Sequence, residues 1–146
     1  VPAVTAHRVG NTNENRSLLR QGSAIDERVL SDRLMTAVNN GVSFVLGTDA
    51  GAVPDHFFGY TGHRELQIYV RLGMTPMQAL MSATSVAARY LKLNDSGLLR
   101  VGYRADLLVL NTNPLEDIRS TEDTHSVYIR GERVDRESLS ASWREE

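Results

Sequence analysis

A short apolar run that ends at a carboxylate constrains this fold more than any other feature of the sequence. Residues 41–51 read GVSFVLGTDAG, and every residue of 42–46 except Ser43 is apolar. A continuous apolar run of this length is typical of a strand buried on both faces, as in a parallel sheet. The acid that follows, Asp49, either begins a turn, because Asp side chains cap backbone amides there, or lies at the mouth of an active site. The spacing alone favours the turn.

A helix is expected on each side of this run. Over residues 25–40 the apolar side chains fall on one helical face, and Gly41 follows at a position suited to a helix C-cap. After Asp49 comes a connection of about a dozen residues, a length more typical of functional or mobile loops than of simple connections. The next helix is predicted over residues 63–72.

A third helical region is predicted over residues 76–92. Thr75 is placed to cap it, Pro76 suits its first position, and Gln78 completes a capping box. A break is expected near residues 84–85. The apolar side of this region is rich in methionine and leucine, which at helical spacing indicates core rather than a binding surface.

Beyond residue 94 the sequence predicts β structure. Residues 105–110, ADLLVL, read as a strand, and residues 126–134, SVYIRGERV, alternate like two strands around Gly131. The last residues, 137–146, read as a short amphipathic helix or a solvated tail. The chain is therefore an α/β half followed by a β half.

The composition excludes several function classes. The chain has 146 residues, which suits one domain, and its formal net charge of -2 gives no reason to expect nucleic acid or an acidic membrane surface as a partner. It contains no cysteine, so disulfides, thiolate metal sites and a cysteine nucleophile are excluded. No apolar stretch approaches the roughly 20 residues of a membrane helix, and the first residues lack a secretion signal. The compartment stays open, with the cytoplasm weakly favoured.

The order of the predicted elements gives the acid a context. The predicted order is a helix, a buried strand, an acid just past that strand, a long loop and then more helix. This is the order of a βα unit in a parallel barrel or an open sheet. In both architectures the chemistry lies at the carboxyl ends of the strands, where the loops converge. This context makes Asp49 as good a candidate for a site residue as for a simple turn residue.

Several motifs, in one order along the chain, carry a resemblance to a known family. They are FVLGTDAG, GYTGHREL, RLGMTPMQALMSATSVAARYLKL, GLLRVGYRADLLVLNTNPLEDI and VYIRGERVDR, and they span roughly residues 40–136. The chain resembles the C-terminal part of a metal-dependent amidohydrolase. GTDAG with HREL is similar to the branch of imidazolonepropionase-like enzymes and amidohydrolase-type dipeptidases.

The resemblance implies the last one or two βα units of a (β/α)8 barrel, followed by part of a small β-sandwich. Residues 42–46 would be the eighth strand, and Asp49 would be the catalytic aspartate that contacts a divalent metal, with zinc expected. It would take a proton from the attacking water and return it to the leaving group. A divalent cation lowers the pKa of its bound water towards about 7, so a modest base suffices.

The same resemblance divides the chain into three parts. Residues 1–93 would hold the barrel units, residues 94–136 the β-sandwich segment, with Asp106 as a local hydrogen-bonding residue, and residues 137–146 the tail or short helix. The family's other metal ligands lie upstream of the aspartate and have no counterpart here, whereas a catalytic zinc site needs about three protein ligands. The chain is therefore interpreted as a C-terminal fragment or a truncated gene product that is inactive alone.

The four histidines are weighed singly as site residues. His63 opens the helix after the long loop, so it either contacts substrate at the active-site mouth or lies in solvent at a helix N-terminus. His56, among aromatic residues of that loop, either lines the pocket or packs against them. His7 could follow a seventh strand over residues 1–6, although a surface position is favoured, and His125 is expected on the surface in a turn.

Two functional hypotheses from different classes follow. In the first, the parent protein hydrolyses a carbon–nitrogen bond in a small amide, cyclic amide or dipeptide-like substrate, and this chain supplies Asp49 and the loop over residues 50–63. Deamination by the same metal-bound water is a variant of it. In the second, the chain is a non-catalytic assembly module, because open strand edges invite pairing with another chain or a second copy. Metal content and hydrolase activity separate the two.

Overall fold

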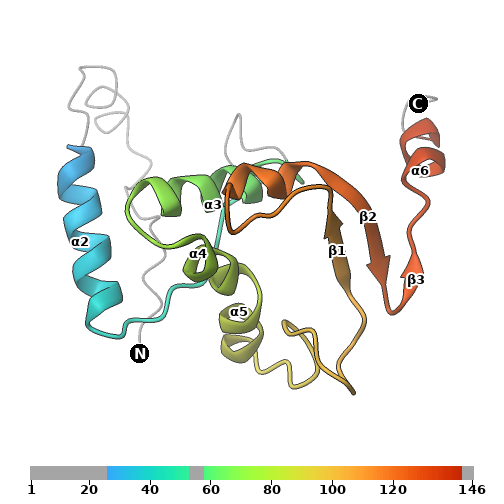
Figure 1. Ribbon diagram of the computed structural model, residues 1–146, viewed down its shortest axis with the longest axis horizontal. Coiled ribbons are helices and arrows are strands. Elements are labelled where there is room, and N and C mark those ends of the chain that lie inside the picture. The colour runs from blue at the N-terminus through green and yellow to red at the C-terminus, as the bar shows by residue number, and fades with distance from the viewer. Residues whose placement is uncertain (1–25, 53–57, 143–146) are drawn as a thin grey trace.

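The computed structural model describes residues 26–52 and 58–142. Helices form one side of the molecule and a small sheet the other, and the sheet leads to an outlying C-terminal helix (Figure 1). The elements in chain order are α2 (Glu27–Asn39), α3 (Thr61–Arg71), α4 (Pro76–Ala83), α5 (Ser85–Tyr90), β1 (Leu107–Leu110), the 3-10 helix η1 (Ile118–Glu122), β2 (Thr124–Ile129), β3 (Glu132–Arg133) and α6 (Arg136–Ser142). The expected mixture of helix and strand is confirmed.

The first two described helices begin and end within two residues of the predicted bounds. Asp26 caps α2 by accepting the Arg28 backbone N–H at 3.0 Å. Gly41 follows α2 with a φ of 77°, the left-handed conformation that glycine adopts without steric cost. The helix α3 begins at Thr61, slightly earlier than the sequence pattern suggests.

The capping box predicted for the third helical region is present. Thr75 Oγ1 accepts the Gln78 N–H at 3.2 Å, and Gln78 Oε1 accepts the Thr75 N–H at 2.8 Å. Pro76 occupies the first helical position. The expected break falls at Thr84, whose φ of -125° and ψ of -95° end α4 before α5 begins. The region is therefore two short helices rather than one.

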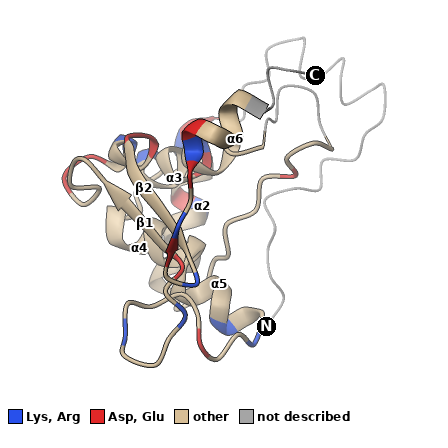
Figure 2. Ribbon diagram, turned by 90° about the vertical axis from the view of Figure 1, so that its right-hand side faces the viewer, with Lys and Arg blue, Asp and Glu red and all other residues tan. Residues whose placement is uncertain are grey.

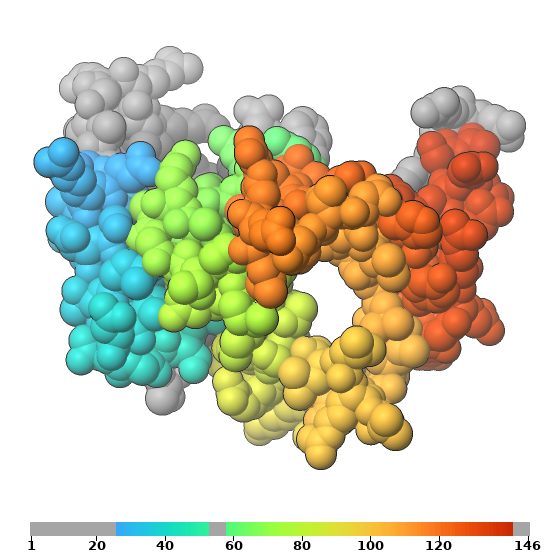
Figure 3. All heavy atoms as spheres, viewed as in Figure 1, coloured from blue at the N-terminus to red at the C-terminus, as the bar shows by residue number. Residues whose placement is uncertain are grey.

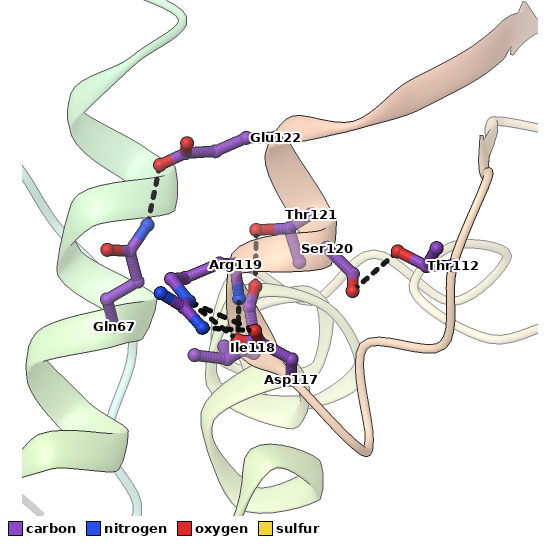
Figure 4. A network of polar contacts seen from close by, with 8 residues as sticks. All are labelled: Gln67, Thr112, Asp117, Ile118, Arg119, Ser120, Thr121 and Glu122. Carbon is purple, nitrogen blue, oxygen red and sulfur yellow. Dashed lines mark hydrogen bonds and ion pairs between the residues drawn. The ribbon is translucent and has the colours of Figure 1, made fainter.

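The core lies where α3, α4 and η1 meet. Its most buried apolar residues are Leu66, Tyr69, Met74, Ala79 and Ile118, with Leu34, Val38, Phe44, Leu46, Val70 and Leu80 half-buried around them. The 3-10 helix contributes Ile118, and beside it Gln67 of α3 donates to the Glu122 carboxylate at 2.5 Å (Figure 4). Through these contacts η1 fixes the connection between β1 and β2 on the helical core.

The β half is a three-stranded antiparallel sheet in the order β1-β2-β3. Gly131, with a φ of 84°, lies in the tight turn between β2 and β3, so the predicted pair of strands around it is confirmed. Asp106 accepts the Arg130 backbone N–H of that turn at 2.8 Å. Its structural role is confirmed, but the bond is not local, because the two residues are 24 positions apart. The chain then enters α6, where the sequence allowed a short helix.

The buried parallel strand expected over residues 42–46 is not formed. This segment is extended chain outside any sheet, and its side chains are exposed or half-buried rather than enclosed on both faces. A parallel strand needs a neighbouring strand to complete its hydrogen bonds, and among the described residues the only sheet is antiparallel. The mixed fold is observed, while the barrel portion and the three-part division of the chain stay predictions.

The molecule is hollowed between the helices and the sheet. Figure 3 shows an opening bounded by α4, α5, β1 and the segment over residues 91–106 that joins α5 to β1. Gly97 anchors this segment, because a Cβ added to it would come within 2.7 Å of both the Thr84 carbonyl oxygen and the Ala88 Cβ. At Gly97 the segment therefore lies directly against α5 and the break between α4 and α5.

Charged residues of both signs are interspersed over the sheet, the loops and α6 (Figure 2). Arg119 and Asp117 form an ion pair of 2.7 Å, and hydrogen bonds from Arg119 hold the pKa of Asp117 below its usual value. Both side chains are solvent-exposed, so the pair adds little to stability.

In the part of the chain that the structure describes, no helix has the length and apolar character needed to span a membrane.

Candidate functional site

The segment that leads to Asp49 is held against the helices. The Leu46 N–H donates to the Ser82 carbonyl of α4 at 3.1 Å, and Phe44 and Leu46 pack against the helical core. Ser82 is itself buried, and its hydroxyl donates to the Ala79 carbonyl at 2.7 Å. The extended chain is therefore fixed on a buried part of α4 shortly before it reaches the carboxylate.

Asp49 begins a turn and is exposed. Its carbonyl accepts the Ala52 N–H at 3.0 Å, and the Thr48 hydroxyl accepts the Ala50 N–H at 3.2 Å. Its φ of 49° is left-handed, a conformation that Asp adopts more readily than most residues and that recurs at functional sites. The turn that the spacing favours is present. Asp49 lies in it just after Leu46, the residue at which the segment is bonded to α4. The catalytic and metal-binding roles of Asp49 stay predictions.

The two ends of the long loop meet beside this turn. Gly51 has a φ of 81°, and a Cβ added there would collide with the Phe58 ring. The chain therefore returns to the turn just before α3 begins, and it leaves the largely exposed Phe58 ring against it. His56 lies outside the described residues, as does His7, so both predictions stand untested.

His63 lies in the first turn of α3 and is partly buried. Its backbone N–H donates to the Tyr60 carbonyl at 3.1 Å. In its side chain, Nδ1 is fully buried and has no hydrogen-bond partner among the residues that the structure describes. The position fits neither a histidine in open solvent nor one satisfied by the core. Sequence patterns carry no signal for this state, since it depends on how α3 packs.

The described residues do not by themselves fit a catalytic metal. No group of three or more His, Asp, Glu or Cys side chains in the ranges 26–52 and 58–142 is arranged to hold an ion. Asp49 could supply one oxygen ligand, whereas an open zinc site needs about three protein ligands. Any metal in this family context would require ligands from outside the described residues.

A polar groove of about 840 Å³ lies between the β2–β3 hairpin and α6. Its lining carries both signs of charge, from Arg133, Asp135, Arg136 and Glu137, and it includes His125. His125 is exposed as expected, but it lies in β2 rather than in a turn. The groove draws no residue from the segment around Asp49, so the two features are separate.

Tyr69 lies on α3 and belongs to the core rather than to a reactive site. Burial raises the pKa of Tyr69 to about 12, and the Glu65 carboxylate adds to the increase. The phenol therefore stays protonated at neutral pH. We assign it a packing role in the core.

Comparison with protein families identifies the class of this chain. The amidohydrolase family pattern matches residues 14–134, which is most of the sequence. The chain belongs to the amidohydrolase family. The resemblance drawn from the motifs between residues 40 and 136 is thereby confirmed.

Relatives of this amidohydrolase chain carry several activities in their names. Ochratoxinase from Aspergillus niger is 38% identical over 94 residues, which are 62% of this chain and 18% of that protein. Imidazolonepropionase from Deinococcus deserti is 34% identical over 101 residues, 66% of this chain and 25% of that protein. Adenine deaminase from Ligilactobacillus salivarius is 31% identical over 117 residues, 80% of this chain and 19% of that protein. The chain spans about a fifth to a quarter of the length of these relatives.

Solved structures give the same family at the level of the fold. Molinate hydrolase superposes with a TM-score of 0.67 at 29% identity, over 75% of this chain and 27% of that one. A Xaa-Pro dipeptidase with methionine in its active site superposes with a TM-score of 0.63 at 36% identity, over 71% of this chain and 25% of that one. About three quarters of this chain therefore share the backbone arrangement of these hydrolases.

Proposed function

We propose that this chain works as part of a metal-dependent hydrolase that acts on carbon–nitrogen bonds. The substrates would be small amides, cyclic amides or dipeptide-like molecules. The observation that supports this most is the position of Asp49, which is carried past a segment fixed on α4 in a chain of the amidohydrolase family. Names among the relatives, such as imidazolonepropionase and Xaa-Pro dipeptidase, point to the same bond class.

Asp49 would act as the proton acceptor and donor. As water adds to the carbonyl carbon, a carbon–oxygen bond forms and the water loses a proton to the Asp49 carboxylate. When the carbon–nitrogen bond breaks, the same proton passes to the leaving nitrogen. A single carboxylate just after a fixed segment suits both transfers. The attacking oxygen and the leaving nitrogen are bonded to the same carbon, so one side chain can reach both.

The cofactor in this proposal is a divalent metal, with zinc expected. Such a metal lowers the pKa of bound water towards about 7. Asp49 is the one described residue that we place beside it, and the remaining ligands would come from outside the described residues. The partner in the reaction is a small molecule, and the mixed surface charge gives no reason to add nucleic acid or a membrane.

Deamination is the closest variant of this function. Adenine deaminase is among the relatives, and its name implies loss of an amino nitrogen rather than cleavage of an amide. Asp49 would perform the same two proton transfers in both reactions, with ammonia as the leaving group in the second. Substrate trials with both bond types therefore belong in the same experiment.

A second candidate function is non-catalytic assembly. The edge strand β1 pairs on one side only, with β2, among the described residues. On one face of the sheet Leu108 and Ile129 leave apolar side chains about half exposed. Unpaired edges with apolar neighbours favour association with another chain or a second copy. This candidate predicts an oligomer of the 146-residue chain by light scattering, without metal or activity.

The two candidates are separated by comparing this chain with a version extended upstream by about 250 residues, the size of a complete barrel. The hydrolase proposal predicts stoichiometric zinc and hydrolysis of small amides in the extended version, and neither in the 146-residue chain. Tight stoichiometric metal binding by the short chain, or an extended version without metal and activity, would contradict it.

A further inference from the structure

Of the asparagines in this chain, only Asn40 is directly followed by a glycine, Gly41. The side-chain amide of an asparagine can be attacked by the backbone nitrogen of the next residue, and glycine hinders this attack least because it has no Cβ. Asn40 is exposed, and a Cβ added to Gly41 would meet none of the described residues within 4 Å. The pair is therefore open to solvent and free of steric protection.

The fold holds the attacking nitrogen in a helix cap. Asn40 is the C-cap residue of α2. The Gly41 N–H donates to the Val38 carbonyl at 3.0 Å, and the Val42 N–H donates to the Ala37 carbonyl at 3.0 Å. This pair of bonds around a left-handed glycine is a Schellman motif. The Gly41 nitrogen can react only after its bond to Val38 has opened.

The Asn40 side chain is also held away from that nitrogen. Its Nδ2 donates to the Thr36 carbonyl at 2.7 Å. Its ψ of 13° nearly eclipses the Gly41 nitrogen with the Asn40 nitrogen, and this turns the Asn40 Cβ away from Gly41. No residue of α2 is buried, however, and helix ends with few buried contacts open locally at low cost in free energy. Reaction therefore proceeds from the opened cap.

We infer that Asn40 is a site of spontaneous deamidation and that the C-cap of α2 controls its rate. In the opened cap the Gly41 nitrogen loses its proton to solvent and bonds to Cγ of Asn40. The bond between Cγ and Nδ2 then breaks, and Nδ2 takes a proton from water and leaves as ammonia. Water opens the resulting five-membered imide at either carbonyl carbon, which leaves aspartate or isoaspartate at position 40.

The modification alters the start of the segment that leads to Asp49. Both products carry a carboxylate where the α2 macrodipole is negative, and both lack the Nδ2 donor. In isoaspartate the main chain runs through Cβ and gains one methylene between the Ala37 carbonyl and the Val42 N–H, so the bond between them no longer fits. Hydrogen exchange at the Val42 amide should therefore be faster in the isoaspartate form than in the unmodified chain. Unchanged exchange would contradict this consequence.

Peptide mapping by mass spectrometry, after incubation of the 146-residue chain at mildly alkaline pH, measures the deamidation rate at each asparagine. The reference is a synthetic peptide of residues 34–45, which is too short to form the cap. Opening two hydrogen bonds predicts a rate at Asn40 roughly 5-fold to 150-fold lower in the chain than in the peptide. Asn39 is the internal control, because it lies at the same helix end without a following glycine, and it should deamidate more slowly. No conversion of Asn40 over the time that this range predicts, or conversion of Asn39 at an equal rate, would overturn the site.

Thr36 offers a matched pair of variants that tests control by the cap. Its side chain is exposed in the last turn of α2, and both variants leave the reacting pair and the Thr36 backbone carbonyl in place. Glycine disfavours a helix relative to alanine, so Thr36→Gly should deamidate at Asn40 roughly 5-fold faster than Thr36→Ala in the 146-residue chain. The same substitutions in the peptide should leave its rate unchanged. Equal rates in the two folded variants, or the same difference in the peptide, would overturn control by the α2 cap.

Discussion

Gly97 should be irreplaceable because of where it lies as well as because of its backbone conformation. Its φ of 81° is left-handed, and an added Cβ would lie 2.7 Å from the Thr84 carbonyl oxygen and 2.7 Å from the Ala88 Cβ. The first of these atoms belongs to the backbone at the break between α4 and α5, so it cannot move aside as a flexible side chain would. Gly97→Ala should therefore push the segment over residues 91–106 off α5.

The expected magnitude has two parts. A left-handed conformation costs a residue with a Cβ about 1–2 kcal/mol, and a methyl group forced into a packed contact costs about 1–3 kcal/mol. Gly97→Ala should thus lower the free energy of unfolding by about 2–5 kcal/mol. Gly102 is the matched control, because its φ of 88° is also left-handed while nothing lies within 4 Å of an added Cβ. Gly102→Ala should cost only the first part.

Urea denaturation followed by circular dichroism measures both variants. The Gly97 variant should lose at least about 1 kcal/mol more than the Gly102 variant, and in a protein of this length each kcal/mol lowers the melting temperature by about 2–4 °C. If the two variants lose the same stability, the contact between Gly97 and the α4–α5 break does not exist in solution. The hollow of Figure 3 would then have a different lower wall.

Two further predictions concern the helices. Thr75→Ala removes the hydroxyl that accepts the Gln78 N–H and should lower the free energy of unfolding by about 0.5–2 kcal/mol, while Thr75→Ser should keep most of it; equal losses in urea melts would contradict the capping box. The pKa of Tyr69 is about 12 in the folded protein and about 10 in the unfolded chain. The contribution of Tyr69 to the free energy of unfolding is therefore complete below pH 10 and is lost as pH rises from 10 towards 12. The total loss is up to about 3 kcal/mol. Tyr69→Phe should flatten that alkaline slope and Tyr90→Phe, at an exposed position, should not; an unchanged slope in the Tyr69 variant would refute the assignment.

The parts of the fold that the sequence predicts are those fixed by local interactions. The capping box at Thr75 and the glycine turn at Gly131 involve residues within three positions of each other, so their signals are complete in a short window. The apolar run over residues 42–46 is different, because a strand exists only with a neighbour to pair with. Its apolar character predicts a strand buried on both faces of a parallel sheet, whereas the structure packs the segment against α4 and the helical core.

The same difference between local and long-range interactions applies to the candidate site. The turn at Asp49 follows from small residues and an acid that tolerates a left-handed backbone, and the sequence gives its location well. The buried Nδ1 of His63 depends on how α3 packs against the rest of the molecule, which no spacing rule reports. His125 was expected in a turn and lies in β2, because alternation alone does not mark the first residue of a strand.

The central claim is that Asp49 transfers the proton in hydrolysis of a carbon–nitrogen bond. The most direct test is kcat for amide hydrolysis by the extended, zinc-loaded protein carrying Asp49→Asn, a change that keeps the size of the side chain and removes its basicity. The control is Asp32→Asn, at an exposed position on α2, which should leave kcat unchanged. Loss of a general acid–base group predicts a fall in kcat of about 100-fold to 10,000-fold for Asp49→Asn at unchanged zinc content. A kcat equal to that of the wild type would contradict the account.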